Sequence, residues 1–400
     1  MNPTKKTMAP LLALTLSLGA AAARAEEPVA APVAPAATAS TAGAERYARE
    51  EAIGQQPEGQ AQASILTLPI HFSGYFWVDT GYMSRTNAQP GQYNQSANYM
   101  GGRFVLAADY KKEFEGFFAK AKVELVGFES EYAGSRYEPH TQDAYVMFGQ
   151  KSWDLQVGRF LAWEVYHRGQ GIELYTAEET GALAGPALYW LDYTRGHKNE
   201  AGQAALHVYP LDFLAFELAG VYGQESSQNN LGFRPVVSVK KWGAELIGGY
   251  EYLKQTPQTD ADKTQTTSQG YSARLQYKRS IVSAGAEFAK ATIDSIGIDG
   301  LVDSGKSLDK ITFGGFANLD MGRHSVGLGY HRTNQTNQRT EHITHDQGFV
   351  SYLIELPIAG LTAKAVYGIA RGHVTDKEAN FVPWDNYLQS FRIRIRYDFK

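Results

Sequence analysis

Residues 391–399 read FRIRIRYDF, and apolar and charged side chains alternate through this stretch without a break. The odd positions are apolar or aromatic and the even positions are charged, the charged ones being Arg392, Arg394, Arg396 and Asp398. Because successive side chains of a β-strand point to opposite faces, this alternation predicts a strand with one apolar face and one charged face. Residues 116–126 repeat it, with Lys120, Lys122 and Glu124 set between apolar neighbours.

The same period of two recurs from residue 70 onward and predicts sixteen strands. We place them at residues 70–83, 99–110, 116–129, 142–149, 153–160, 203–209, 213–223, 234–240, 244–254, 271–278, 281–292, 310–319, 324–333, 346–355, 361–372 and 387–400. Tight links such as 210–212 and 279–280 alternate with long polar links such as 85–97, 255–270 and 334–345. Fourteen or eighteen strands are the alternatives, because element boundaries are the least certain part of such a prediction.

The composition favours a sheet that meets lipid on one face and water on the other. The chain holds 24 Tyr, 19 Phe and 40 Gly, yet its mean hydropathy is −0.35. No run after residue 25 is long and apolar enough to be a membrane helix. A sheet in hydrocarbon must pair every edge. We therefore predict an all-β fold, a closed antiparallel transmembrane β-barrel over residues 70–400.

The first 69 residues differ from the rest of the chain. Lys5 and Lys6 precede an apolar run, and Ala23-Arg24-Ala25 follows it, which predicts a secretory signal peptide over residues 1–25. Residues 26–69 are rich in Ala and Pro, which predicts a flexible periplasmic linker. A membrane anchor is the alternative for the first segment, and a coiled-coil or cell-wall-binding role is the alternative for the second.

Charge and cysteine content exclude several classes of protein. The formal net charge is −4, and it becomes more negative by three when Lys5, Lys6 and Arg24 leave with the signal peptide. A mildly acidic chain is a poor nucleic-acid binder, so we expect no nucleic-acid partner. With 0 cysteines, the chain has neither disulfides nor thiolate metal sites. We expect no cofactor and no metal.

Together, the signal peptide, the alternating strands, the rhythm of short and long links and the stretch 391–399 resemble bacterial outer-membrane porins of the sixteen-strand type. Residues 156–160, QVGRF, before a long link, are similar to the phosphate-selective type. The departure is Lys400 after Phe399, where such porins usually finish on an aromatic residue. The resemblance implies passive diffusion of small hydrophilic solutes and ions across a Gram-negative outer membrane. It also implies a homotrimer that contacts lipid and lipopolysaccharide and is inserted by the barrel assembly machinery.

In such porins the third long loop bends into the bore, and residues 161–202 occupy the matching place. A link of this length without a strand usually has a function. Its acidic residues outnumber its basic ones, so we expect an acidic constriction loop, whose charged members are Glu164, Glu173, Glu178, Glu179, Asp192 and Glu200 against Arg168, Arg195 and Lys198. Aromatic residues of the same loop could guide sugars or pack the loop against the wall: Trp163, Tyr166, Tyr175 and Trp190.

Strand parity puts a basic wall on the water-facing side of the predicted barrel, composed of Arg103, Lys120, Lys122, Arg392, Arg394 and Arg396. An acidic loop facing this wall would create a transverse field that aligns polar solutes. The alternative is that these charges pair with acids and only hydrate the interior.

Three classes of function remain open: a general diffusion channel, a channel selective for an anion such as phosphate or for a saccharide, and a structural or adhesive barrel. Catalysis is not expected, because neither Gly-x-Ser-x-Gly nor His-Glu-x-x-His is present. His342, His345 and Asp346 have a metal-like spacing, and Asp294, Asp299, Asp303 and Asp309 could bind calcium loosely. We interpret the first group as a solvated polar loop tip, and the second group lacks the ordered spacing of an EF-hand.

Overall fold

A computed structural model of the chain describes residues 63–65, 68–87, 94–131, 134–136, 139–163, 165, 198, 200–225, 227–257, 264–297, 306–337, 342–375 and 384–399. The predicted signal peptide and most of the predicted linker lie outside these residues. In the part of the chain that is described, no helix is long and apolar enough to cross a membrane.

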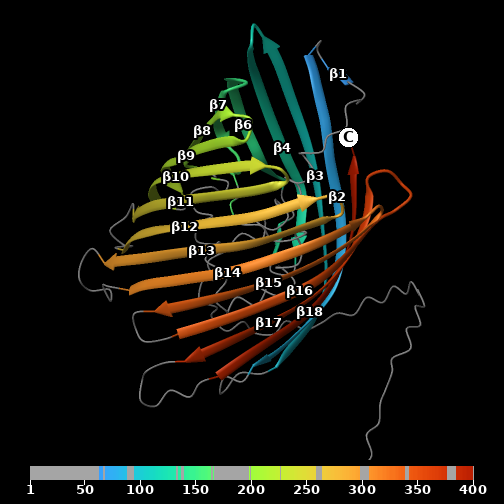
Figure 1. Cartoon of the computed structure of the whole chain (residues 1–400), viewed down its shortest axis with the longest axis vertical. Coiled ribbons are helices and arrows are strands. Elements are labelled where there is room, and N and C mark those ends of the chain that lie inside the picture. The colour runs from blue at the N-terminus through green and yellow to red at the C-terminus, as the bar shows by residue number, and fades with distance from the viewer. Residues whose placement is uncertain are drawn as a thin grey trace, which may run out of the picture. The chain divides into compact units, whose positions relative to one another are not determined.

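Sixteen long strands in the described residues form one closed antiparallel ring (Figure 1), which confirms the predicted fold class. They are β2 (Leu68–Asn87), β3 (Gln95–Phe114), β4 (Phe117–Glu131), β6 (His140–Gln150), β7 (Trp153–Arg159), β8 (Gly202–Leu211), β9 (Leu214–Glu225), β10 (Gln228–Lys241), β11 (Ala244–Pro257), β12 (Thr264–Arg279), β13 (Val282–Gly297), β14 (Lys306–Met321), β15 (His324–Asn337), β16 (His342–Glu355), β17 (Leu361–Thr375) and β18 (Trp384–Phe399). Two short strands, β1 (Ala63–Ile65) and β5 (Gly134–Arg136), pair with β2 and β4.

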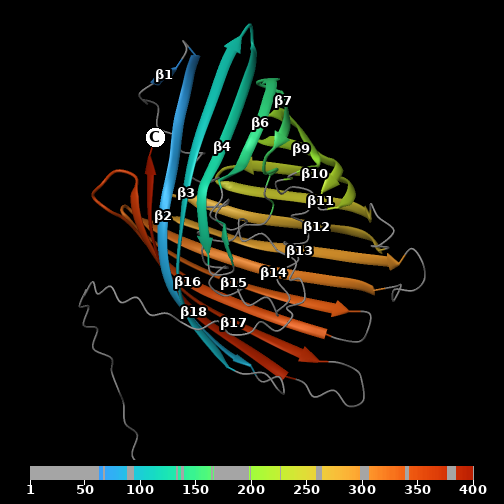
Figure 2. The ribbon, with the colours of Figure 1, turned by 180° about the vertical axis from the view of Figure 1, so that it is seen from behind.

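The ring closes where the last strand meets the first long one. β18 pairs with β2 over fourteen residue pairs, from Asn386 opposite Asn87 to Phe399 opposite Gly74. Figure 2 shows these two strands, red and blue, running side by side. This register sets Arg394 opposite Asp79 on one face of the sheet. Closure leaves no unpaired edge between these strands, which is what a sheet needs where water cannot reach its backbone groups.

Side chains alternate between a polar interior and an apolar exterior. In β18, Arg392 is 1% and Arg394 is 5% exposed, whereas Ile395 between Arg394 and Arg396 is 49% exposed. Each long strand carries at least one exposed large apolar side chain, represented by Val78, Leu106, Leu125, Val146, Leu155, Leu206, Leu218, Leu231, Leu246, Leu275, Val282, Phe313, Leu328, Val350, Ile369 and Ile393. An apolar surface that surrounds a whole sheet far exceeds the patches that a water-soluble monomer exposes.

Seven tight links lie at one rim of the ring. They are residues 115–116, 151–152, 212–213, 242–243, 280–281, 322–323 and 356–360. At the opposite rim most links are longer, but the strands extend farther than their alternation predicted. The expected strands 213–223 and 234–240 become β9 and β10 and leave only residues 226–227 between them. The expected boundary of the linker is also too late, because β1 and the start of β2 fall before residue 70.

Gly360 lies in the tight link between β16 and β17, and its φ is +80°. A Cβ at this position would lie 2.1 Å from the carbonyl oxygen of Asp398, whereas a Cβ at Gly322, whose φ is +64°, would meet nothing within 4 Å. Gly322→Ala should therefore lower the free energy of unfolding only by the cost of a positive φ in a residue with a Cβ, roughly 1 kcal/mol. Gly360→Ala should lower the free energy of unfolding by a further ~1–3 kcal/mol, because the backbone must move.

Urea unfolding of the two refolded variants in detergent measures this difference. Equal losses for Gly360→Ala and Gly322→Ala would contradict the close approach of residues 360 and 398.

Candidate functional site

A pair of arginines shares one carboxylate at the seam where the ring closes. Arg392 Nε donates to Asp79 Oδ2 at 2.6 Å, and Arg394 Nη2 donates to the same oxygen at 2.6 Å. All three side chains are 5% exposed or less, and they belong to β18 and β2. Since one carboxylate faces two guanidinium groups, this part of the inner wall keeps an excess of positive charge.

Two aromatic rings of β2 contact the guanidinium groups of Arg394 and Arg396. The guanidinium carbon of Arg394 lies 3.5 Å from the centroid of the Trp77 ring, and that of Arg396 lies 4.0 Å from the Tyr75 ring. Arg396 also forms an ion pair with Asp398, with Nη2 and Oδ1 at 2.8 Å. Cation–π contacts of this kind contribute about 0.5–2 kcal/mol each. Tyr75 and Trp77 are themselves buried on the interior face of β2.

The remaining basic residues of the predicted wall lie on β3 and β4. Arg103 is buried and donates from Nη2 to the side-chain oxygen of Gln142. Lys122 lies 3.2 Å from Glu124 and 3.0 Å from Asp143. Lys120 is half-buried two residues before Lys122. The six basic residues thus occupy β18, β3 and β4, which lie on either side of β2.

Sequence reasoning missed the groups that pair with this wall. Asp79, Glu124 and Asp143 face the interior beside the arginines and lysines. Strand parity was the available signal, since Asp79 alternates with Val78 and Thr80. The pairing itself depends on the register between β18 and β2, more than 300 residues apart in sequence, and no local pattern encodes that register.

A second buried charge network lies on β7 to β10. His207 contacts Asp154 at 2.6 Å through Nδ1 and Glu217 at 3.1 Å through Nε2. Glu217 also accepts a hydrogen bond from Arg234, which is completely buried. Tyr209 donates from its hydroxyl to Asp154 at 3.0 Å. None of these residues was predicted as a site residue.

The network fixes the chain that leaves β7. The main-chain N–H of Trp163 donates to Glu217 Oε2 at 2.8 Å, and the Trp163 carbonyl accepts from Arg234. The Trp163 ring stacks on His207, with centroids 5.0 Å apart and planes 12° from parallel. Phe160 and Ala162 pack on Ala205 and Ala219. The segment therefore follows the inner surface of the wall instead of leaving the barrel.

Two residues farther on, Val165 packs against Val236 and Ile247 of β10 and β11. In the sixteen-strand ring, β10 is eight strands away from β18. Residues 160–163 and Val165 thus lie across the barrel from the arginines of β18. Of the predicted loop residues, Trp163, Lys198 and Glu200 are described. The Lys198 carbonyl accepts from Arg159, and Glu200 donates its main-chain N–H to Glu225. Outside the described residues lie Glu164, Arg168, Glu173, Glu178, Glu179, Asp192, Arg195, Tyr166, Tyr175 and Trp190.

The weaker candidates do not assemble into sites. Arg159, in the stretch 156–160, donates to the main-chain carbonyls of Thr141, Gln142 and Lys198. His342, His345 and Asp346 belong to strand β16, so their interpretation as loop residues is wrong, and His345 is buried. Asp294 and Asp309 also lie in strands, while Asp299 and Asp303 lie outside the described residues. Among the described residues, no group of three or more His, Asp or Glu could hold a metal ion.

Solved structures of outer-membrane proteins share this fold. OmpT of Vibrio cholerae in its trimer form aligns with a TM-score of 0.55 at 12% identity, over 82% of this chain and 99% of that one. The outer-membrane channel DcaP of Acinetobacter baumannii aligns with a TM-score of 0.57 at 9% identity, over 85% and 100%. An anion-selective porin from Comamonas acidovorans aligns with a TM-score of 0.55 at 10% identity, over 82% and 99%.

At these identities the likeness concerns the fold. No protein-family model matches the sequence, and no curated protein matches it. The specific resemblance of residues 156–160 to phosphate-selective porins finds no support among these structures.

Proposed function

We propose that the barrel is a water-filled channel in a Gram-negative outer membrane, through which small hydrophilic solutes and ions diffuse passively. The observation that carries this proposal is the sixteen-strand ring with an apolar exterior and a charged interior. A ring of this size is too wide for its own side chains to fill. The apolar exterior suits hydrocarbon, and the likeness to known porin folds agrees with it.

Planar bilayer recording tests this function. The refolded mature chain should insert and give stepwise conductance increments, because each closed ring supplies one aqueous path. A chain that inserts into vesicles with the circular dichroism of β-structure but never conducts would contradict the channel and leave the adhesive or structural alternative.

The position of residues 160–163 and Val165 against the inner wall supports a constriction loop over residues 161–202. This segment starts opposite the arginines of β18, and its sequence is acidic. We infer a transverse field between loop and wall, with the basic side set by Arg392, Arg394 and Arg396. The three-to-two ratio of these arginines to Asp79 and Asp398 supports a preference for anions at this wall.

Reversal potential under a KCl gradient tests the wall. The variant should neutralise Arg392, Arg394 and Arg396 to Gln together with Asp79→Asn, so that no carboxylate is left buried without its cations. We expect the reversal potential to shift toward cation preference. The control is Arg371→Gln, whose exposed arginine pairs with Asp385 on the outer face of the sheet. An unchanged ion preference in the wall variant would remove the transverse field.

A homotrimer is proposed by analogy with the trimer form of OmpT. The mass of the refolded chain in detergent, from light scattering with the detergent contribution subtracted, tests it. A monomer mass under conditions that support conductance would contradict it. Phosphate selectivity has less support, because Arg159 of the stretch 156–160 donates from Nε and Nη1 to main-chain carbonyls.

A further inference from the structure

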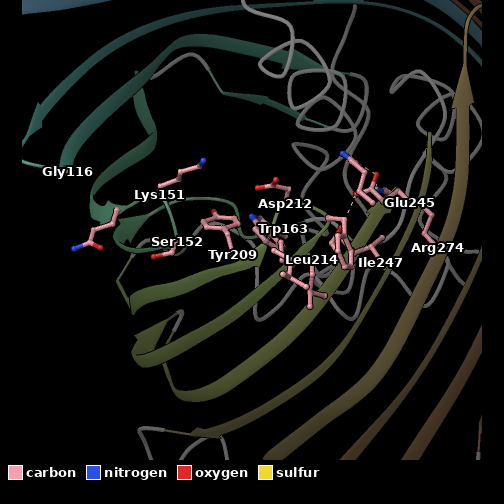
Figure 3. Close-up of a pocket in the computed structure, with 16 residues that line it drawn as sticks. Gly116, Lys151, Ser152, Trp163, Tyr209, Asp212, Leu214, Glu245, Ile247 and Arg274 are labelled. Atoms are coloured by element: carbon pink, nitrogen blue, oxygen red, sulfur yellow. Dashed lines mark hydrogen bonds and ion pairs between the residues drawn. The ribbon is translucent and has the colours of Figure 1, made fainter. Parts of the chain in front are cut away.

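A cavity of about 640 Å³ opens inside the barrel near the rim of tight links. It is lined by the links after β3, β6 and β8 and by the adjoining ends of β8 to β12, together with Trp163. Figure 3 shows Lys151, Ser152 and Tyr209 on one side of this cavity and Glu245 and Arg274 on the other, with Trp163 and Asp212 between them. Its volume is in the range of small-molecule sites.

Arg274 is the unusual member of the lining. Its side chain is nine-tenths buried, and Glu245 lies 3.9 Å from Nη2, which is too far for a hydrogen bond. Glu287 of β13 lies opposite Arg274 in the register of the two strands. The Nε–H has no hydrogen-bond partner in the described residues. A buried guanidinium with spare donors is costly unless an acceptor comes to it. Arg274 is therefore suited to receive an anionic group from a solute.

Glu245 does not satisfy this arginine, because its carboxylate lies beyond hydrogen-bond distance. Oε1 accepts from the Ser238 hydroxyl at 3.2 Å, and Oε2 accepts from the Gln276 amide at 2.5 Å. Lys240 Nζ lies 3.7 Å from the same carboxylate and is largely exposed. The charged end of the cavity thus offers donors to an anion, and carboxylate and hydroxyl oxygens to the hydroxyl groups of a solute.

The other end of the cavity is an aromatic platform that is fixed before any solute arrives. Trp163 stacks on His207, and its main chain is bonded to Glu217 and Arg234. The Tyr209 ring lies 6.4 Å from the Trp163 ring, centroid to centroid, and its hydroxyl is held by Asp154. Rings held in this way can pack on a solute ring without losing side-chain entropy.

We propose that this cavity is a binding subsite for an acidic monosaccharide of the hexuronate type. Its carboxylate would be received by Arg274, its hydroxyls by Glu245, Ser238 and Asp212, and its apolar ring face by Trp163 and Tyr209. The mixture of acidic acceptors with one available guanidinium favours a solute that bears both hydroxyls and a carboxylate. This inference rests on the proposed channel, for which the subsite would lie at the periplasmic end of the path.

Titration calorimetry on the refolded full chain in detergent tests the subsite with four probes. Glucuronate carries ring, hydroxyls and carboxylate, glucose lacks the charge, benzoate lacks the hydroxyls, and acetate lacks the ring. We expect glucuronate to bind most tightly. Arg274→Gln should weaken glucuronate by about 10-fold to 100-fold, the usual loss for a hydrogen bond to a charged group, and leave glucose unchanged. Trp163→Leu should weaken glucuronate and glucose alike.

Two further variants separate binding from misfolding. Arg274→Lys should restore part of the glucuronate affinity, and Arg371→Gln, which removes an arginine on the outer face, should change nothing. If benzoate bound as tightly as glucuronate, the cavity would be a site for aromatic acids and the proposal would be overturned. Equal affinity for glucuronate and glucose would also overturn it.

Recording from the same chain in a planar bilayer distinguishes a failure of the subsite from a failure of the channel. If the channel conducts but glucuronate neither binds nor reduces the current, the subsite is wrong and the channel stands. If glucuronate binds in detergent with the expected dependence on Arg274 but no conductance is seen, the channel is wrong and the subsite stands.

Discussion

Asp79→Ala is expected to lower the free energy of unfolding by about 3–5 kcal/mol, because it leaves two buried guanidinium groups without their shared anion. Arg392 and Arg394 both donate to one oxygen of Asp79, and all three groups are almost fully buried. The loss falls at the seam between β18 and β2, so the ring should also close more slowly. Urea unfolding and the rate of refolding into detergent measure the two effects.

Asp398→Ala is the matched control, because Asp398 is partly exposed and, within the described residues, forms its ion pair with Arg396 two residues away in the same strand. A pair that water reaches is worth about 0–1 kcal/mol. Replacing Asp79, Arg392 and Arg394 together by Leu, Met and Met should recover most of the stability, since a buried ion group can be exchanged for apolar side chains. If Asp79→Ala were no more destabilising than Asp398→Ala, the seam would not depend on this contact.

The second large effect is expected at Glu217. Glu217→Ala removes the anion that Arg234, His207 and the Trp163 main chain share, and Arg234 is completely buried. We expect a loss of about 3–5 kcal/mol in the free energy of unfolding. The chain at residue 163 also loses its attachment to the wall, so single-channel current should fluctuate more than in the unchanged protein.

Two controls accompany this variant. Glu217→Gln keeps an acceptor of the same shape and should cost less than Glu217→Ala. Asp346→Ala removes a partly exposed carboxylate near Arg332, whose side chain is exposed, and should cost about 0–1 kcal/mol. Quiet current in Glu217→Ala, with a loss of stability no greater than in Asp346→Ala, would show that the network does not anchor the chain at Trp163.

The fold was predictable because one physical requirement repeats along the whole chain. Each strand must present apolar side chains outward. The local sequence alone therefore predicts the last strand, through the alternating apolar residues Phe391, Ile393 and Ile395. The number of strands followed from counting such stretches. Strand ends were harder, since beyond the apolar belt both faces can be polar. At the hairpin of β9 and β10, Asn230 is buried inside and Leu231 is exposed outside, although the surrounding residues resemble a loop.

The candidate site was predictable only in part, because it depends on contacts across the ring. Parity indicated the side of the sheet on which Arg392 and Arg394 lie, yet their partner Asp79 depends on the closing register. The network around His207 combines β7, β8, β9 and β10 with a main-chain group of Trp163. Such a combination has no signature in any single segment. The predicted strand 234–240 began beside Pro235, whereas in the structure Pro235 lies within β10, which starts at Gln228.

Labelling of single cysteines tests most directly whether the barrel is apolar outside and wet inside. The chain has 0 cysteines, so each variant carries one thiol only. Ser238→Cys would face the interior cavity, and Val237→Cys, one residue away, would face outward. In lipid vesicles a charged, water-soluble thiol reagent should modify residue 238 and spare residue 237. Equal modification of both, or modification of residue 237 alone, would contradict the account.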